Sequence, residues 1–169
     1  MMKTLVYLFA ITMLLFAGCA KDEMFTDDAD MNLKSAEVKS IPLKGDFYSV
    51  PTAWDANGMM SAGYLVGNIT HLGKMIPELS TFEITAADLS TYPNIVYWME
   101  GQLAAANGDL LFYKIVGTAD MTIGITEADV IYTGGTGRLE KYTGYAHFTG
   151  QTDPTTGITY CTTEGALYK

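Results

Sequence analysis

Histidine, the side chain best suited to acid–base or metal chemistry near neutral pH, occurs only twice in this sequence, and the two residues lie far apart. The chain has two histidines, His71 and His147, and Glu100 lies within a strand-like segment. Histidine and glutamate exchange protons or contact a polar ligand when a fold brings them together. We therefore treat His71, Glu100 and His147 as candidates for an interior cavity. The alternative is that the histidines are polar residues at strand ends or on strand faces.

The sequence lacks the motifs that are typical of metal-binding sites, cofactor-binding sites and sites of covalent catalysis. There is no His-x-His, His-Glu-x-x-His or paired-cysteine spacing, no Gly-x-Ser-x-Gly turn and no phosphate-binding loop before a helix. Cys161 lies between Tyr160 and Thr162, where we expect a small buried side chain and not a nucleophile. The sequence predicts no catalytic residue, no cofactor and no metal site.

Composition and charge narrow the class of protein. Of the 169 residues, 49% are hydrophobic and 17% are charged, which is enough apolar material for one folded domain. The formal net charge is −9, with 10 basic against 19 acidic residues, so a phosphate backbone would be repelled. Nucleic acid is therefore excluded as a partner. The 17 glycines and 11 tyrosines favour strands and turns over helices.

Short apolar segments divided by turn residues follow one another from residue 41 onward. Pro51 is expected to end the first strand, and Asn57-Gly58 and Asn107-Gly108 are expected to form turns, the second a tight hairpin. The predicted strands are 43–50, 63–72, 81–86, 96–105, 110–119, 121–125 with 130–132 as one strand or two, 142–149, and 158–163 continued by 165–168.

These segments predict an all-β fold. We expect an antiparallel up-and-down barrel of about eight strands, with a two-sheet β-sandwich as the alternative. The predicted strand 110–119 is apolar on both faces, so we expect it to be buried on two sides, inside and outside a barrel. One face carries Leu110, Phe112 and Val116, and the other carries Leu111, Tyr113 and Ile115.

A glycine-rich corner, Gly134-Gly135-Thr136-Gly137, joins two of the predicted strands. Three glycines in four residues suit a tight reversal with positive φ and do not suit a helix. Together with the following Arg138 and the later Gly144-Tyr145-Ala146, this corner resembles the signature corner of dirigent proteins and of allene-oxide-cyclase-like barrels. The segment 67–74 also resembles a stretch that recurs in bacterial relatives of these barrels.

The resemblance implies a barrel whose cyclase and dirigent members direct the outcome of a reactive intermediate inside an apolar interior. The residues that those members use do not match positions here, so no functional residue is transferred. The disulfide of many dirigent proteins is not expected either, because Cys161 is the only cysteine beyond Cys19. The single arginine, Arg138, is expected to pair with Glu140 or to pack beside the turn, the alternative being an anion site at a barrel mouth.

The first 19 residues predict the leader of a bacterial lipoprotein. Lys3 precedes an apolar run that is too short to cross a bilayer comfortably. The run ends in Leu15-Phe16-Ala17-Gly18-Cys19, which resembles the lipobox, where cleavage between Gly18 and Cys19 leaves a diacylated Cys19. The alternative is an ordinary secretory leader with an incidental cysteine. The following Ala20-Lys21-Asp22-Glu23 resembles a signal that sends lipoproteins to the cell surface.

The sequence thus divides into a signal peptide at 1–18, a flexible tether at 19–40 that starts from the lipidated Cys19, and a β-barrel domain at 41–169. We expect a lipid-anchored protein of the bacterial outer membrane that faces the cell exterior. The favoured role is non-catalytic binding of a small apolar ligand, a glycan or a protein. The alternatives are a cyclase or isomerase acting on a small apolar substrate inside the barrel, and a structural homo-oligomer. An open interior favours binding or catalysis, and a filled one favours the structural role.

Overall fold

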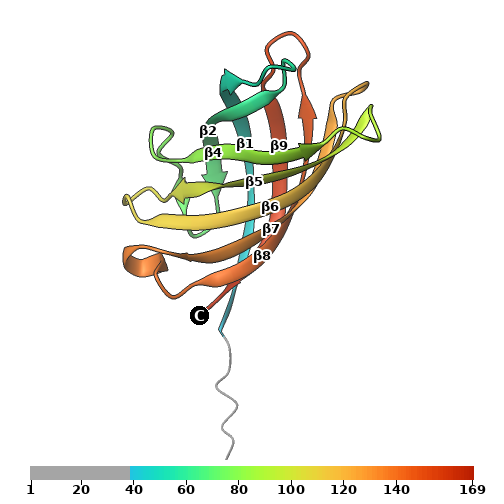
Figure 1. Ribbon diagram of the computed structural model, residues 1–169. Helices are drawn as coiled ribbons and strands as arrows, with labels where there is room; N and C mark the ends of the chain where they lie inside the picture. Colours follow the sequence, from blue (N-terminus) through green and yellow to red (C-terminus); the bar gives the residue numbers. More distant parts are fainter. Residues whose placement is uncertain (1–38) are drawn as a thin grey trace, which may run out of the picture. The chain divides into compact units, whose positions relative to one another are not determined.

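The computed structural model describes residues 39–169, which form an antiparallel β-barrel (Figure 1). Among these residues the one helical element is a short 3-10 turn, η1 (Gly137–Leu139), and no helix has the length and apolar character needed to span a membrane. The strands are β1 (Ser40–Trp54), β2 (Met60–Ile69), β3 (Gly73–Lys74), β4 (Thr81–Asp88), β5 (Asn94–Ala104), β6 (Leu110–Asp120), β7 (Ile125–Gly135), β8 (Thr143–Thr152) and β9 (Thr159–Tyr168).

The barrel closes because β1 pairs with strands on both of its sides. Residues 40–49 of β1 pair antiparallel with β9, and residues 45–54 pair antiparallel with β2. The remaining strands follow in the order β9-β8-β7-β6-β5-β4-β2, so eight strands form the closed wall, and β3 adds a short pairing to β2. The predicted antiparallel up-and-down barrel is confirmed, and the alternative two-sheet sandwich is wrong.

β1 continues beyond Pro51, where the sequence predicted its end. Pairing with β9 stops at Ser49, so Pro51 lies where β1 has only one neighbouring strand, a position in a sheet that tolerates proline. The register of β1 against β2 shifts between Pro51 and Ala53 and again before Trp54. The strand therefore bends at the proline and does not end there.

The two Asn-Gly turns are confirmed. Pairing of β5 with β6 extends to Ala104 and Leu110 on either side of the Asn107-Gly108 turn, where Gly108 has a φ of 88°. Residues 121–124, predicted as part of a strand, form instead the turn that connects β6 to β7. β7 then runs without interruption through the predicted 130–132, and β9 covers both parts of the last predicted strand.

One end of the barrel is closed by apolar side chains. The segment 70–80 between β2 and β4 contributes Leu72 and Met75, each only 2% exposed. Its Leu72 carbonyl accepts from the Ala106 N–H of the β5–β6 turn, and its Ile76 N–H donates to the carbonyl of Ala104 at the end of β5. Beneath it lie strand residues that are at most 1% exposed, namely Leu43, Ile69, Leu111 and Leu167. We call this the closed end, and it is also the end at which β1 begins and β9 finishes.

The outer face of β6 differs from the prediction. Leu111, Tyr113 and Ile115 point inward and are buried, as expected. Phe112 and Val116 are 37% and 49% exposed, so the expected burial on the second side is wrong. The reason is the single-layered wall: alternate residues of each strand face outward, and nothing among residues 39–169 packs over that face.

Candidate ligand-binding cavity

The interior of the barrel contains a cavity of about 380 Å³. All eight strands of the closed wall contribute to its lining, as do turn residues at the end opposite to the closed end, among them Gly58, Ile123 and Gly157. The cavity therefore opens between the β1–β2, β6–β7 and β8–β9 turns, which we call the mouth. Its volume lies in the range of sites that hold small molecules.

Most of the cavity wall is apolar. β2, β4, β5 and β6 alternate between inward and outward residues, and their inward residues are aliphatic, aromatic or sulfur-containing. Burial of apolar surface supplies most of the binding free energy in sites of this kind. The apolar side chains that line this part are Leu65, Ile69, Phe82, Ile84, Ile95, Met99, Leu103 and Ile115.

The remaining side of the wall, on β1, β7 and β9, carries uncharged hydroxyl groups. Four of them, on Ser49, Thr126, Thr159 and Thr163, are buried. The Thr163 hydroxyl donates to a backbone carbonyl at 3.1 Å, and the hydroxyl oxygens of Thr159 and Thr152 lie 2.9 Å apart. The cavity thus has an apolar side and a side of mostly satisfied hydroxyls.

Tyr97 reaches from β5 across Gly117 of β6 to β7. A Cβ atom at Gly117 would lie 2.5 Å from the Tyr97 ring, so a larger residue there would collide with the ring. The Thr126 hydroxyl donates to the carbonyl of Thr118 at 3.0 Å and therefore accepts from the Tyr97 hydroxyl at 2.8 Å. Burial raises the pKa of Tyr97 to about 12, so this hydroxyl is neutral at physiological pH.

Two further tyrosines, Tyr113 of β6 and Tyr132 of β7, line the part of the cavity near the closed end. They are direct neighbours in the ladder, and each side chain is 3% exposed. The Tyr113 hydroxyl donates to the carbonyl of Thr81 at 3.2 Å. Burial raises the pKa of both tyrosines well above the ordinary value, so both are neutral hydrogen-bonding groups.

Cys161 lines the cavity as a protonated thiol. It is 6% exposed and forms no disulfide, and its sulfur lies 3.8 Å from the carbonyl oxygen of Thr159. Burial raises the pKa of Cys161 to about 12, and a nucleophile or metal ligand needs the thiolate. The predicted small buried residue is confirmed.

Charged and metal-binding side chains are scarce around the cavity. The one charged residue among the described lining is Asp120, at the mouth, where its carboxylate accepts hydrogen bonds from the backbone of Thr122 and Ile123. In residues 39–169, no three side chains of the metal-binding types gather closely enough to hold an ion.

The three residues that the sequence suggested for the cavity lie outside it. His71 occupies the turn after β2 with a φ of 67° and is exposed to solvent. Glu100 of β5 and His147 of β8 are exposed on the outer face, because the alternation of each strand places their chain neighbours inward. The structure does not bring these three residues together.

His147 belongs instead to an exposed group on the outer face. One carboxylate oxygen of Asp129 accepts from the Tyr145 hydroxyl at 2.6 Å and lies 2.9 Å from Nδ1 of His147. The hydrogen bond from Tyr145, with a smaller contribution from His147, lowers the pKa of Asp129, and the same bond raises the pKa of Tyr145. The three side chains contact one another across the paired strands β7 and β8. None of the three lines the cavity.

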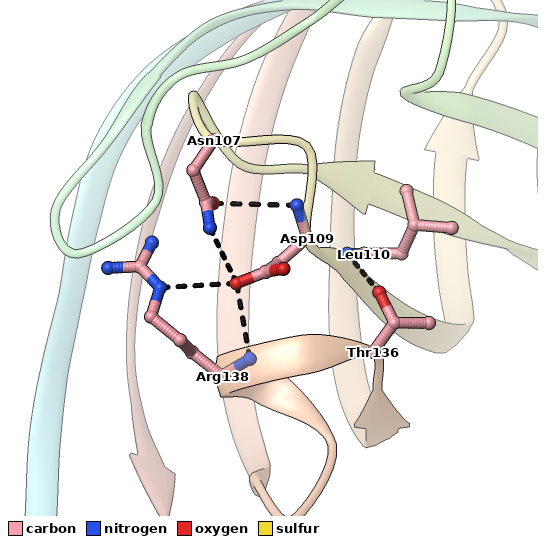
Figure 2. Close-up of polar contacts among 5 residues, drawn as sticks. All are labelled: Asn107, Asp109, Leu110, Thr136 and Arg138. Atoms are coloured by element: carbon pink, nitrogen blue, oxygen red, sulfur yellow. Dashed lines mark hydrogen bonds and ion pairs between the residues drawn. The ribbon is translucent and has the colours of Figure 1, made fainter.

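The glycine corner contacts the β5–β6 turn at the closed end (Figure 2). The Asp109 carboxylate accepts hydrogen bonds from Asn107, from the backbone N–H of Arg138 and from Nε of Arg138, and the Thr136 hydroxyl accepts from the backbone N–H of Leu110. Arg138 thus pairs with Asp109 and not with the predicted Glu140. It lies at the closed end, which rules out an anion site at the mouth.

The sequence pointed only partly to the residues that line the cavity. Tyr113 and Ile115 lie on one face of the predicted strand 110–119, but Ser49 and Thr126 carried no signal. Comparison of the chain with protein-family models, with curated proteins and with solved structures finds no match. Gly18 and Cys19, the predicted cleavage and lipidation site, lie outside the described residues.

Proposed function

We propose that this protein is a lipid-anchored lipoprotein of the bacterial outer membrane, facing the cell exterior, whose barrel binds a small apolar ligand without catalysis. The observation that supports the binding role is the mostly apolar cavity of about 380 Å³. A purely structural barrel needs no such space, because its interior is filled by side chains. The apolar wall favours an apolar ligand over a glycan, whose many hydroxyls need polar partners.

The groups on the wall support binding over a cyclase or isomerase reaction. Burial raises the pKa of Tyr97 and of Cys161 to about 12, so both are neutral near pH 7. General acid–base catalysis works best with a group whose pKa is close to the working pH. Shape and neutral hydrogen bonds are therefore what this wall offers to a ligand.

The anchoring part of the proposal rests on the leader and on Cys19. Several acyl chains, each contributing about 0.8 kcal/mol per buried methylene, hold a folded domain firmly at a membrane. β1 begins at Ser40, at the closed end, so the chain enters the barrel at the end opposite to the mouth. Because a tether would join the barrel at the closed end, its point of attachment does not cover the mouth.

Binding of the neutral fluorescent probe N-phenyl-1-naphthylamine tests the ligand site. The chain from Ala20 onward contains every barrel strand and lacks the acylated cysteine, so it can be studied without detergent once circular dichroism and cooperative melting show that it is folded. We expect saturable fluorescence enhancement. In Ile115→Trp the larger side chain occupies the cavity, so affinity should fall at least about tenfold.

Val116→Trp is the matched control, because Val116 is the next residue of the same strand and is half-exposed on the outer face. This variant should bind the probe like the unchanged chain. Lack of saturable binding to the unchanged chain, or an equal loss of affinity in the two variants, would contradict a ligand site inside the barrel.

A second candidate role is self-association through the outer face. Phe112, Val116 and Ile131 on β6 and β7 are exposed apolar side chains, and such residues on neighbouring strands are suited to a contact between copies. Light scattering of the chain from Ala20 onward measures its mass in solution. A monomer at high concentration would contradict this role, whereas a dimer that Ile131→Lys dissociates would support it.

A further inference from the structure

The cavity offers no positive charge to pair with an anionic ligand, and its deep part carries no charged side chain among the described residues. No lysine, arginine or histidine is among the described lining residues, and the charged one, Asp120, is acidic. The whole chain has a formal net charge of −9, which further disfavours an anion. Moving an ionised carboxylate or phosphate into an apolar site is costly unless an opposite charge pairs with it. A ligand that enters the deep part of this cavity is therefore uncharged.

The deep part of the cavity nevertheless holds a hydroxyl that is not committed to the protein. Of the three tyrosines on the wall, Tyr97 is bonded to Thr126 and Tyr113 donates to Thr81. No side chain or backbone group among the described residues accepts from or donates to the hydroxyl of Tyr132. Among residues 39–169, every completely buried side-chain oxygen has a hydrogen-bond partner. The Tyr132 oxygen has no such partner in these residues, so it is not completely buried and keeps some accessible surface. Because Tyr132 is an inward residue of β7 and lines the cavity, we infer that this oxygen faces the cavity.

The position of Tyr132 places this free donor near the floor. β7 runs from Ile125 at the mouth to Gly135 at the closed end, and Tyr132 is three residues from the latter. The side chain is 3% exposed, and burial raises its pKa, so it donates a hydrogen bond and does not ionise near pH 7. A second lining hydroxyl without a partner among residues 39–169, that of Ser49, lies on β1 nearer the middle of the wall.

We propose that the cavity selects uncharged apolar molecules that carry a carbonyl or hydroxyl oxygen at the end that enters first, and that the Tyr132 hydroxyl donates to this oxygen. This inference rests on the proposed binding function and specifies its ligand class. Without such an oxygen the Tyr132 donor stays unpaired when the ligand displaces water, and an unpaired buried donor weakens binding.

Three ligands of nearly the same shape test the inference: 2-acetylnaphthalene, 2-ethylnaphthalene and 2-naphthoate. Each is titrated as a competitor of N-phenyl-1-naphthylamine on the chain from Ala20 onward, at pH 8. In Tyr132→Phe, which removes only the hydroxyl, the affinity for 2-acetylnaphthalene should fall by about fivefold, and the affinity for 2-ethylnaphthalene should change by less than about twofold. The unchanged chain should bind 2-naphthoate at least about tenfold more weakly than 2-acetylnaphthalene.

Tyr145→Phe serves as the matched control, because it removes a tyrosine hydroxyl from the outer face and should leave all three affinities unchanged. Failure of the unchanged chain to bind the fluorescent probe would overturn the proposed function and this inference together. Binding of the probe with equal effects of Tyr132→Phe on the ketone and the hydrocarbon would overturn the role of Tyr132 alone. Binding of 2-naphthoate as tightly as the ketone would overturn the selection for uncharged ligands.

Discussion

The carboxylate of Asp109 binds Arg138 twice, through the backbone N–H and through Nε, with each nitrogen 3.1 Å from the same oxygen Oδ2 (Figure 2). The two residues lie on different connections, the β5–β6 turn and the corner after β7. Their pairing therefore fixes two loops against each other at the closed end of the barrel, on the opposite side of the cavity from its mouth.

Asp109→Ala should lower the melting temperature and leave ligand binding unchanged. The substitution removes the acceptor of three hydrogen bonds, two of which join the two loops, but Asp109 is not among the residues that line the cavity. Thermal melting and titration with N-phenyl-1-naphthylamine measure the two effects. The control is Glu140→Ala, an exposed acid in the same corner that makes no ion pair among the described residues. Equal melting temperatures for the two variants would contradict a clamping role for Asp109.

Gly137→Ala should destabilise the fold by more than Gly58→Ala. Both glycines have positive φ, 55° and 75°, so alanine is strained at either position by about 1–2 kcal/mol. A Cβ atom at Gly137 would also lie 2.1 Å from an Asp109 carboxylate oxygen, whereas one at Gly58 would meet nothing within 4 Å. Chemical denaturation of the two variants gives the difference in the free energy of unfolding. A smaller loss for Gly137→Ala would show that the corner yields without breaking the Asp109 contacts.

The stability of the barrel should depend on pH partly through Asp109. Hydrogen bonds from Asn107 and then from Arg138 hold the pKa of Asp109 below its ordinary value of about 3.9. A carboxyl whose pKa is lower in the folded state stabilises the fold above its unfolded pKa, and this contribution is lost as the pH falls through the folded pKa. The melting temperature, measured from pH 7 to pH 2, should therefore fall less steeply below about pH 4 in Asp109→Asn than in the unchanged chain.

The pH profile of Asp109→Asn should not become flat, because other aspartates have lowered pKa values for the same reason. Asp55 and Asp153 each accept backbone hydrogen bonds within their own turns, and Asp129 accepts from Tyr145. If the variant and the unchanged chain showed parallel profiles in the acid range, Asp109 would not be linked to the stability of the fold.

Cys161 should resist alkylation in the folded protein. Its burial and its pKa of about 12 leave almost no thiolate at pH 8, and iodoacetamide reacts with the thiolate. In the chain from Ala20 onward Cys161 is the only cysteine, so mass spectrometry reports its modification directly. We expect complete modification in guanidinium chloride and little without it. Rapid modification of the folded chain would mean that the thiol is accessible and ionised.

Cys19→Ser should abolish lipidation of the full-length chain. In the proposed lipoprotein the lipid would be attached through a thioether to the Cys19 sulfur, and a serine hydroxyl does not replace that sulfur. Metabolic labelling with a radioactive fatty acid followed by membrane fractionation measures the result, with Cys161→Ser as the control that keeps Cys19. Label retained in Cys19→Ser would mean that the resemblance of the leader to a lipobox is misleading.

The strand pattern of the barrel followed from local sequence signals. Asn107-Gly108 marks a hairpin that the structure contains, and the burial of Leu111, Tyr113 and Ile115 on the inward face of β6 also agrees with prediction. The extent of β1 did not follow, because proline disrupts a strand only where a neighbouring strand needs the missing N–H as a donor. A neighbouring strand distant in the sequence decides this, and Pro51 lies past the last pair with β9.

The candidate site was harder to predict than the fold. Glu100 and His147 were chosen for their chemistry, but strand alternation places them on the outer face, opposite to Tyr97 and Phe148. Whether a barrel is hollow depends on the summed volume of all inward side chains and on how the strands pair. No single segment of the sequence therefore predicts a cavity. Gly117 shows the difficulty, because its role depends on Tyr97 from the neighbouring strand lying over it.

The pairing of Ser40 with Tyr168 joins the first residue of the barrel to the penultimate residue of the chain. The wall cannot close until β9 is available to β1, so every strand of the barrel must be synthesised before a continuous ring of strands exists. The pairing of β9 with β1 is therefore the step that completes the ring, and it joins residues that lie far apart in the sequence.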